Sequence, residues 1–166
     1  MPIDFKSMAD ILWRFKTTPS PASQCEIIQT FDPDTVYVRE KVMLPDPNMP
    51  MVEMRCVLRR YFEGNRIVLA WKAISDDLMI PHGAGSIIGN RSGWSVIQEK
   101  NEMECFFQGC FTLSTLIFPS KLQSCKPTPG TLTEILLQAV QDHGVKFGNS
   151  LKEIVDTHRK KLIASN

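Results

Sequence analysis

The chain has little net charge and few histidines, and both shortages exclude classes of function. Its 166 residues include 19 basic and 18 acidic side chains, so the net charge at neutral pH is only +1. No overall electrostatic field therefore attracts nucleic acid or an anionic membrane. His82, His143 and His158 are far apart in the sequence, and none has a partner at the spacing of a zinc site. We expect no metal, no other cofactor and no nucleic-acid partner.

The five cysteines are an odd number without CxxC spacing, which favours a reducing compartment over a disulfide framework. Cys25, Cys56, Cys105 and Cys110 fall inside predicted strands as small buried hydrophobes, whereas Cys125 falls in a loop. Charged residues interrupt residues 1–16, so this segment has no apolar run suited to a signal peptide or a membrane span. These features predict a cytoplasmic protein, with a nuclear location as the alternative.

Catalytic motifs are missing as well. Segment 83–89 is rich in glycine, but no predicted strand ends directly before it and no helix begins after it, which argues against a nucleotide loop. The segment also lacks the serine elbow of hydrolases and the lysine of a phosphate-binding loop. His143 lies on the apolar side of a predicted helix, where a histidine is more often part of the core than a catalyst. We expect no catalytic residues.

Residues 51–74 predict a β-hairpin, which determines the fold class. A Gly-Asn pair at positions 64 and 65 separates two runs rich in branched and aromatic residues, the pattern of a two-residue turn. With this turn Leu58 pairs with Trp71, because side chains alternate between the two faces of a strand. One face is then apolar, with Arg60 as its only charged member. The apolar residues of this face are Met54, Cys56, Leu58, Phe62, Ile67, Leu69, Trp71 and Ala73.

An amphipathic helix over residues 129–163 is expected to cover the apolar face. Apolar side chains recur there at the i, i+3, i+4, i+7 spacing of a helix with one buried side. Thr131 and Glu134 have the spacing of a capping box, which predicts the start of the helix. Gly144 and Gly148 weaken its middle, and a second capping box follows Gly148. One kinked helix and two shorter helices are both compatible with this pattern.

The other elements are those of a meandering sheet with one short helix. Asp4 is a suitable N-cap for a helix over residues 5–16. Strands joined in uninterrupted succession pair antiparallel, and a terminal helix covers one face of the sheet. We therefore predict a single α+β domain with a curved sheet of about six or seven strands packed on a long C-terminal helix. Its parts are a helix and linker at 1–23, the sheet at 24–118 with strands at 24–31, 36–44, 94–99 and 103–118 beside the hairpin, and the terminal helix at 129–163.

Three segments of the sequence resemble a known protein family. VLRRYFEGNRIVLAWKAI at 57–74, SGWSVIQ at 92–98 and the Phe-rich strand at 105–118 resemble the START-like region of the oomycete mating-specific protein family. This resemblance implies the helix-grip fold, in which a curved antiparallel sheet grips a terminal helix around a tunnel that holds a lipid or sterol in START relatives. It also implies a domain shortened at its N-terminus, unless helix 5–16 stands in for the elements that open a full START domain. It transfers no catalytic residues.

A cavity between the sheet and the terminal helix is the expected ligand site, with the loop at 75–85 as its rim. By the resemblance, the partner is a hydrophobic small molecule or lipid, bound without covalent chemistry, and transient membrane contact is compatible with such a ligand. The candidate lining residues are Leu58, Arg60, Leu69, Trp71, Phe107, Phe111, Leu113, Leu136, Val140, His143 and Phe147.

Several alternatives stay open. Arg60 could orient a ligand head group, pair with Glu40, or extend to water, and the aromatic residues could be plain core. A second function is a protein interaction module without a ligand, which uses a sheet edge or the charged face around Arg55, Arg59 and Lys72. A third is a cyclase or aromatase-like enzyme with His143 or a cysteine as the acid or base, by analogy of fold alone.

Overall fold

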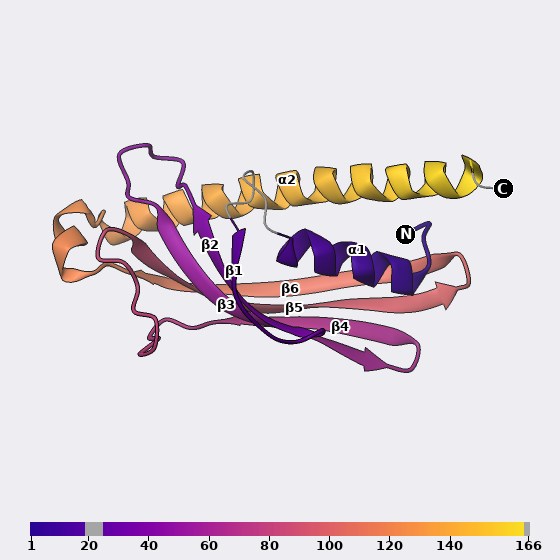
Figure 1. Ribbon diagram of the computed structural model, residues 1–166. Coiled ribbons are helices and arrows are strands. Elements are labelled where there is room, and N and C mark those ends of the chain that lie inside the picture. The colour runs from indigo at the N-terminus through magenta and orange to yellow at the C-terminus, as the bar shows by residue number, and fades with distance from the viewer. Residues whose placement is uncertain (19–24, 165–166) are drawn as a thin grey trace.

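The computed structural model describes residues 1–18 and 25–164, and the side chains of His143, Arg159 and residues 161–164 lie outside this description. Within the described residues, six strands form one sheet in the order β1-β2-β3-β4-β5-β6, and neighbours in this order pair antiparallel. Both α-helices lie on the same side of the curved sheet (Figure 1). The predicted α+β class and antiparallel sheet are thus confirmed. The strands are β1 (Cys25–Asp32), β2 (Thr35–Val42), β3 (Val52–Glu63), β4 (Arg66–Ala73), β5 (Ile87–Asn101) and β6 (Glu104–Ile117).

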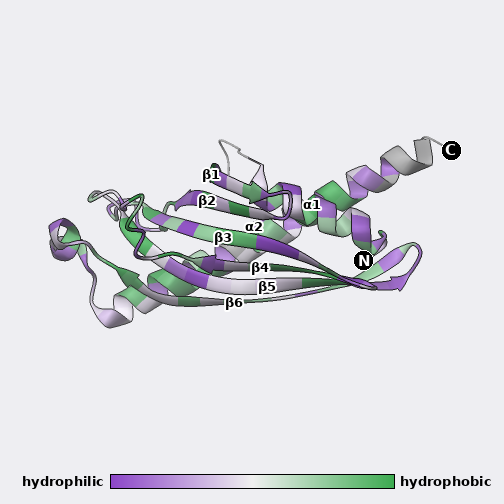
Figure 2. Ribbon diagram, turned by 60° about the horizontal axis from the view of Figure 1, so that its bottom comes forward, coloured by the Kyte–Doolittle hydropathy of each residue, from purple (hydrophilic) through white to green (hydrophobic). Residues whose placement is uncertain are grey.

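The central hairpin, β3 and β4, has the predicted register. Leu58 pairs with Trp71 and Arg60 with Leu69, as the alternation of faces requires. Gly64 has φ +58°, a left-handed conformation that glycine adopts without steric cost, so the two-residue turn forms where the Gly-Asn pair predicts it. Figure 2 shows hydrophobic and hydrophilic residues alternating along the strands.

Strand β5 is much longer than the predicted strand at 94–99. Gly89 and Gly93 lie inside it, at positions where the neighbouring strands come too close for a side chain. A Cβ atom on Gly93 would lie 2.5 Å from the Cys110 carbonyl oxygen and 2.5 Å from the Trp71 ring. Beyond the end of β4, β5 also pairs with β3 in a short parallel stretch at Val52 and Glu53. The glycines therefore allow close packing within the sheet.

Helix α1 (Phe5–Thr17) lies on the inner face of the sheet, the face that carries the hairpin's apolar residues. The Asp4 carboxylate accepts a hydrogen bond of 2.9 Å from the Ser7 backbone N–H, which confirms it as the N-cap. Met8 and Leu12 of α1 are fully buried in a cluster with Leu69 of β4. Of the predicted linker at 17–23, only Thr17 and Thr18 are described, and residues 19–23 lie outside the described part.

Helix α2 (Pro129–Ala164) is continuous through Gly144 and Gly148, so the two-helix interpretation is wrong. A short 3₁₀-helix, η1 (Ser120–Cys125), precedes it and was not predicted. Leu132 of α2 is buried in one core cluster, whereas Leu151 and Val155 are buried in the cluster that contains α1. In the described residues, no helix combines the length and apolar character needed to cross a bilayer.

The cysteines are all free thiols, but not all are buried. Cys25, Cys56 and Cys105 lie in the core as predicted. Cys110 is exposed, contrary to expectation, because it alternates with Gly109 and Phe111 of the inner face and therefore lies on the outer face of the edge strand β6. Cys125 is exposed too, within η1 instead of a loop.

Candidate functional site

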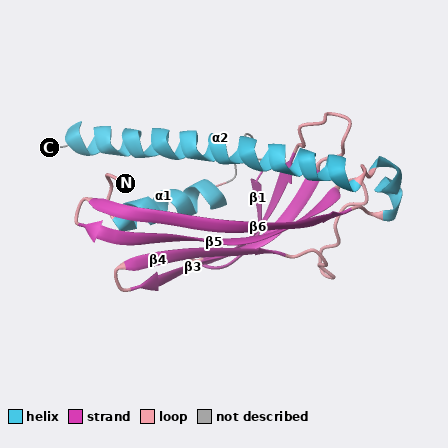
Figure 3. Ribbon diagram, turned by 180° about the vertical axis from the view of Figure 1, so that it is seen from behind, coloured by secondary structure: helices cyan, strands magenta, loops and turns pink. Residues whose placement is uncertain are grey.

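A pocket of about 280 Å³ lies between the inner face of the sheet and α2, and we call it the inner pocket. Its sheet wall comes mainly from the strands β2 to β6, and its helix wall comes from one side of α2. Figure 3 shows α2 lying over the inner face of the sheet, above the strands that form the opposite wall. Most lining side chains are apolar, and the volume is near the lower end of the range for small-molecule sites.

The sequence predicted much of this wall. Seven of the candidate residues line the inner pocket, although ligand binding itself stays a prediction. They are Trp71, Phe107 and Phe111, Leu113, Leu136, Val140 and Phe147. His143 belongs to α2, but its side chain lies outside the described residues.

Leu58 and Leu69 do not line the inner pocket. Leu69 is 2% exposed and belongs to the core cluster that contains Met8 and Leu12 of α1, whereas Leu58 is buried with Val36 of β2. The sequence predicts α1 but not that it lies on this part of the sheet. The helix fills space that the prediction left for a ligand.

Arg60 is also absent from the pocket, because it holds α1 against the sheet. Its Nη1 atom lies 2.6 Å from Asp10 Oδ1 on α1, and its Nη2 atom lies 2.8 Å from Asp34 Oδ1 in the β1–β2 turn. The guanidinium also lies 5.1 Å from the centre of the Trp13 ring. Arg60 therefore does not line the inner pocket, and its expected pairing with Glu40 or free extension into water is wrong.

Two cationic side chains line the inner pocket, and neither is among the lining residues predicted from the sequence. Lys16, in the last turn of α1, is partly buried, and its Nζ atom lies 4.2 Å from the centre of the Trp71 ring and 5.9 Å from that of Phe147. Burial lowers the pKa of Lys16 to about 8; the charge of Arg91 adds to this shift, and Glu40 opposes it. Among the described residues, no carboxylate forms an ion pair with Lys16.

The second cation, Arg91, enters the pocket from β5. Its Nη2 atom forms an ion pair with the Glu40 carboxylate of β2, and the two side chains are 16% and 18% exposed. The Nε atom of Arg91 is enclosed, and no hydrogen-bond acceptor in the described part of the chain reaches it.

Burial raises the pKa of Cys25 to about 11 and also raises that of Cys56, so these thiols beside the pocket are neutral at neutral pH.

The pocket opens between α2 and the edge strand β6. Phe111 lines it and is nevertheless 47% exposed, and Gly109 and Gly144 are exposed lining residues on the two sides. A Cβ atom on Gly144 would meet no other atom within 4 Å. The inner pocket is therefore open to solvent along the side of the sheet.

The loop at 75–85 is not the rim of the pocket. It lies against the opposite, outer face of the sheet, where Arg55 is 2% exposed. The Arg55 guanidinium donates a hydrogen bond of 2.8 Å to Glu53 Oε1 and others to the carbonyl oxygens of Ile80 and Pro81. The expected charged interaction face around Arg55 is therefore wrong, since residue alternation places Arg55 under this loop.

Other contacts brace the same loop. His82 Nδ1 lies 3.1 Å from Glu53 Oε1, and Nε2 lies 3.2 Å from the Ile74 carbonyl oxygen. The Tyr37 hydroxyl donates a 2.6 Å hydrogen bond to Asp77 Oδ2, and burial together with this carboxylate raises the pKa of Tyr37 to about 12. A sequence signal existed for this cluster: Glu53 and Arg55 alternate with apolar residues at the expected outer positions of β3.

Comparisons with known proteins identify no family for the chain. No protein-family model matches it, and no curated protein matches it.

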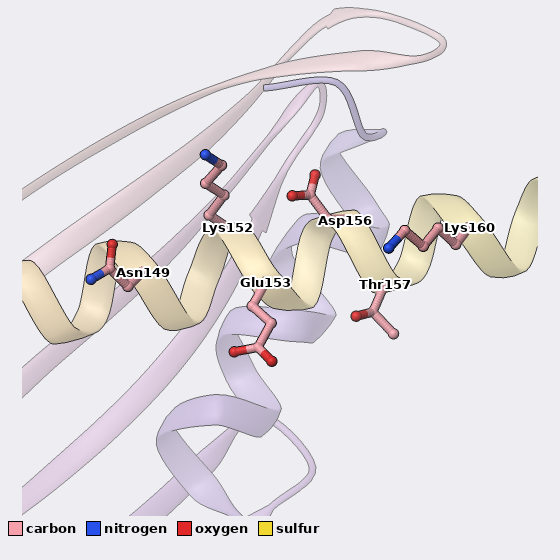
Figure 4. Close-up of a pocket in the computed structure, with 6 residues that line it drawn as sticks. All are labelled: Asn149, Lys152, Glu153, Asp156, Thr157 and Lys160. Atoms are coloured by element: carbon pink, nitrogen blue, oxygen red, sulfur yellow. The ribbon is translucent and has the colours of Figure 1, made fainter.

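A second hollow, of about 380 Å³, lies on the surface of α2. Figure 4 shows its six lining side chains, and all of them belong to this helix. Because the lining residues are polar and none comes from an opposing element, the hollow is a groove between solvated side chains and not an enclosed ligand site. They are Asn149, Lys152, Glu153, Asp156, Thr157 and Lys160.

Proposed function

We propose that the chain is a START-like, helix-grip module that binds a hydrophobic ligand of lipid type in the inner pocket, without covalent chemistry. The supporting observation is that Leu136, Val140 and Phe147 of α2 face the apolar sheet wall across an unfilled volume of about 280 Å³. A core that served stability alone would be filled to the packing density of protein interiors.

The pocket volume limits the affinity. At roughly 30 Å³ for each group of water or methylene size, it holds about nine such groups. At about 0.5–0.8 kcal/mol per non-hydrogen atom, nine such groups give a dissociation constant of roughly 5 μM to 0.5 mM for the enclosed part. A single alkyl chain fits the volume of the inner pocket better than a bulky lipid with two acyl chains.

Native mass spectrometry of the purified protein tests the proposal, followed by titration with a panel of single-chain lipids. We expect a copurifying ligand or saturable binding to the panel. A homogeneous apo mass together with no binding to the panel contradicts the proposal.

A pair of variants on α2 locates the site. Val140→Trp would fill the inner pocket and abolish binding, because Val140 is a lining residue. Val145→Trp places the same side chain on the same helix at a position that is 58% exposed and outside the pocket lining, so this control is expected to bind normally. Equal binding by both variants would place the ligand elsewhere.

A second candidate function is protein interaction through the loop at 75–85. Leu78 and Met79 are 86% and 90% exposed, and the contacts of Arg55 and Asp77 hold the loop that presents them. Exposed apolar side chains on a braced loop are typical of interaction surfaces. Under this alternative, the double variant Leu78→Ser/Met79→Ser would lose partner capture and keep lipid binding.

A further inference from the structure

The charges at the inner pocket do not balance. Lys16 and Arg91 both line it, and no lining residue in the described part of the chain is an aspartate or glutamate. Glu40 stands beside the pocket and is engaged by Arg91. One positive charge is thus left without a matching carboxylate in a mostly apolar surrounding, where an uncompensated charge is unfavourable.

The donors of these cations point to a missing acceptor. The Nε atom of Arg91 is enclosed and has no acceptor among the described residues. The Lys16 ammonium faces the rings of Trp71 and Phe147, which attract the cation but accept no conventional hydrogen bond. The Lys16 ammonium therefore offers N–H groups to whatever occupies the pocket, and Arg91, which lines the same pocket, adds a second positive charge.

We propose that the ligand is a single-chain fatty acid whose carboxylate binds Lys16 and Arg91, while its alkyl chain lies along the apolar wall formed by Leu113, Leu136 and Val140. This inference rests on the proposed function and specifies its ligand class. A carboxylate carries one negative charge and matches the single excess positive charge, whereas a phosphate monoester carries about −1.5 to −2 at neutral pH. The arginine fork and the ammonium both suit a carboxylate acceptor.

The chain length follows from the volume. With room for about nine groups of methylene size, the pocket encloses a medium-length alkyl chain with its head group. The opening beside Phe111 and Gly144 lets the end of a longer chain extend toward solvent.

Calorimetric titration of the full chain at pH 7 with decanoate, 1-decanol and decyl phosphate tests this assignment. Decanoate is expected to bind at least tenfold more tightly than 1-decanol and more tightly than decyl phosphate. Equal affinities for decanoate and decanol would overturn the anionic ligand and leave the proposed function intact. Binding of none of the three would overturn the proposed function itself. Tighter binding of decyl phosphate than of decanoate would overturn the assignment of the head group as a carboxylate.

Two matched variants assign the preference to Lys16. Lys16→Met is expected to lower the decanoate affinity about tenfold and leave the decanol affinity unchanged, and the retained decanol binding reports an intact fold. Lys6→Met removes the same charge from an exposed position of the same helix and is expected to change neither affinity. An unchanged decanoate affinity in Lys16→Met, or an equal loss for decanoate and decanol, would overturn the role of Lys16.

Discussion

The ammonium nitrogen of Lys16 lies 4.2 Å from the centre of the Trp71 ring, so a cation from α1 stands against the aromatic wall of the inner pocket. Such a contact contributes about 0.5–2 kcal/mol, which offsets only part of the cost of removing an ammonium group from water. The position is therefore poor for stability and favourable for an anionic ligand. Residues of this kind, whose environment costs stability, are frequent at functional sites.

Lys16→Met is expected to stabilise the ligand-free protein at neutral pH. The pKa of Lys16 is about 8 in the folded protein, against about 10.4 in an unfolded chain. Below pH 8 both states carry the charge, and the folded state bears the full cost of burying it. Between pH 8 and about 10.4 the unfolded state holds more protons, so the stability of the wild type rises with pH.

Urea unfolding from pH 6 to pH 10 measures this effect. The variant is expected to be more stable than the wild type by about 1–3 kcal/mol at pH 6–7, with a difference that shrinks above pH 8. The difference between the two proteins isolates Lys16 from its titratable neighbours Arg91, Glu40, Cys25 and Cys56. A constant difference across this range would contradict the burial of the charge, and Lys6→Met serves as the exposed control.

Gly144→Leu is expected to separate stability from binding. Leucine is the better helix former by about 0.7 kcal/mol, so the free energy of unfolding rises. The new side chain enters the pocket opening, where a Cβ atom meets nothing within 4 Å, and decanoate binding falls. Gly148→Leu gives the same gain in helix propensity outside the pocket lining and should leave binding unchanged. Denaturant unfolding and calorimetry of both variants check this pair.

Arg55→Met is expected to destabilise the protein by about 3–5 kcal/mol. The substitution leaves the Glu53 carboxylate, whose side chain is 5% exposed, buried without its main cationic partner. It also removes the hydrogen bonds to Ile80 and Pro81, so limited proteolysis should cut the loop at 75–85 more rapidly. Arg59→Met, at an exposed position of the same strand, should change stability by less than about 0.5 kcal/mol. Equal effects of the two substitutions would show that the buried network is not stabilising.

Gly93→Ala is expected to destabilise the sheet by about 1–3 kcal/mol, because the added methyl group overlaps the Cys110 carbonyl oxygen and the Trp71 ring. Displacement of Trp71 should also change the tryptophan emission spectrum. Gly83→Ala adds the same methyl group where no atom lies within 4 Å and is expected to be neutral. Thermal unfolding of the two variants gives the comparison, and a neutral Gly93→Ala would mean that the strands separate easily at this point.

Local patterns predicted the hairpin but not the charged part of the site. The register of β3 and β4 follows from a two-residue turn and alternating apolar residues, which are properties of neighbouring positions. Lys16, Glu40 and Arg91 belong to three elements far apart in the sequence, and their meeting depends on how α1 and β5 lie on the sheet. Arg91 also lies outside the strand predicted at 94–99, so its place on the inner face of β5 could not be read from alternation.

The placement of α1 explains the remaining errors. A short amphipathic helix has an apolar side, but the periodicity does not say which part of a sheet it covers. Here it covers Leu69 and engages Arg60, which removes both from the predicted cavity. The long helix was easier to place on the sheet, because its apolar side is long enough to require a large surface.

Helix α2 reaches the core at two separate places, at Leu132 near its start and at Leu151 and Val155 in its second half. Between these two places, Val140 and Gly144 line the inner pocket. The size of the side chains at these two places therefore sets the distance between α2 and the sheet, and with it the depth of the inner pocket. Truncating Leu132 or Val155 to alanine would bring one end of α2 closer to the sheet. The length of the longest alkyl chain that the protein binds would then change, although neither residue lines the inner pocket.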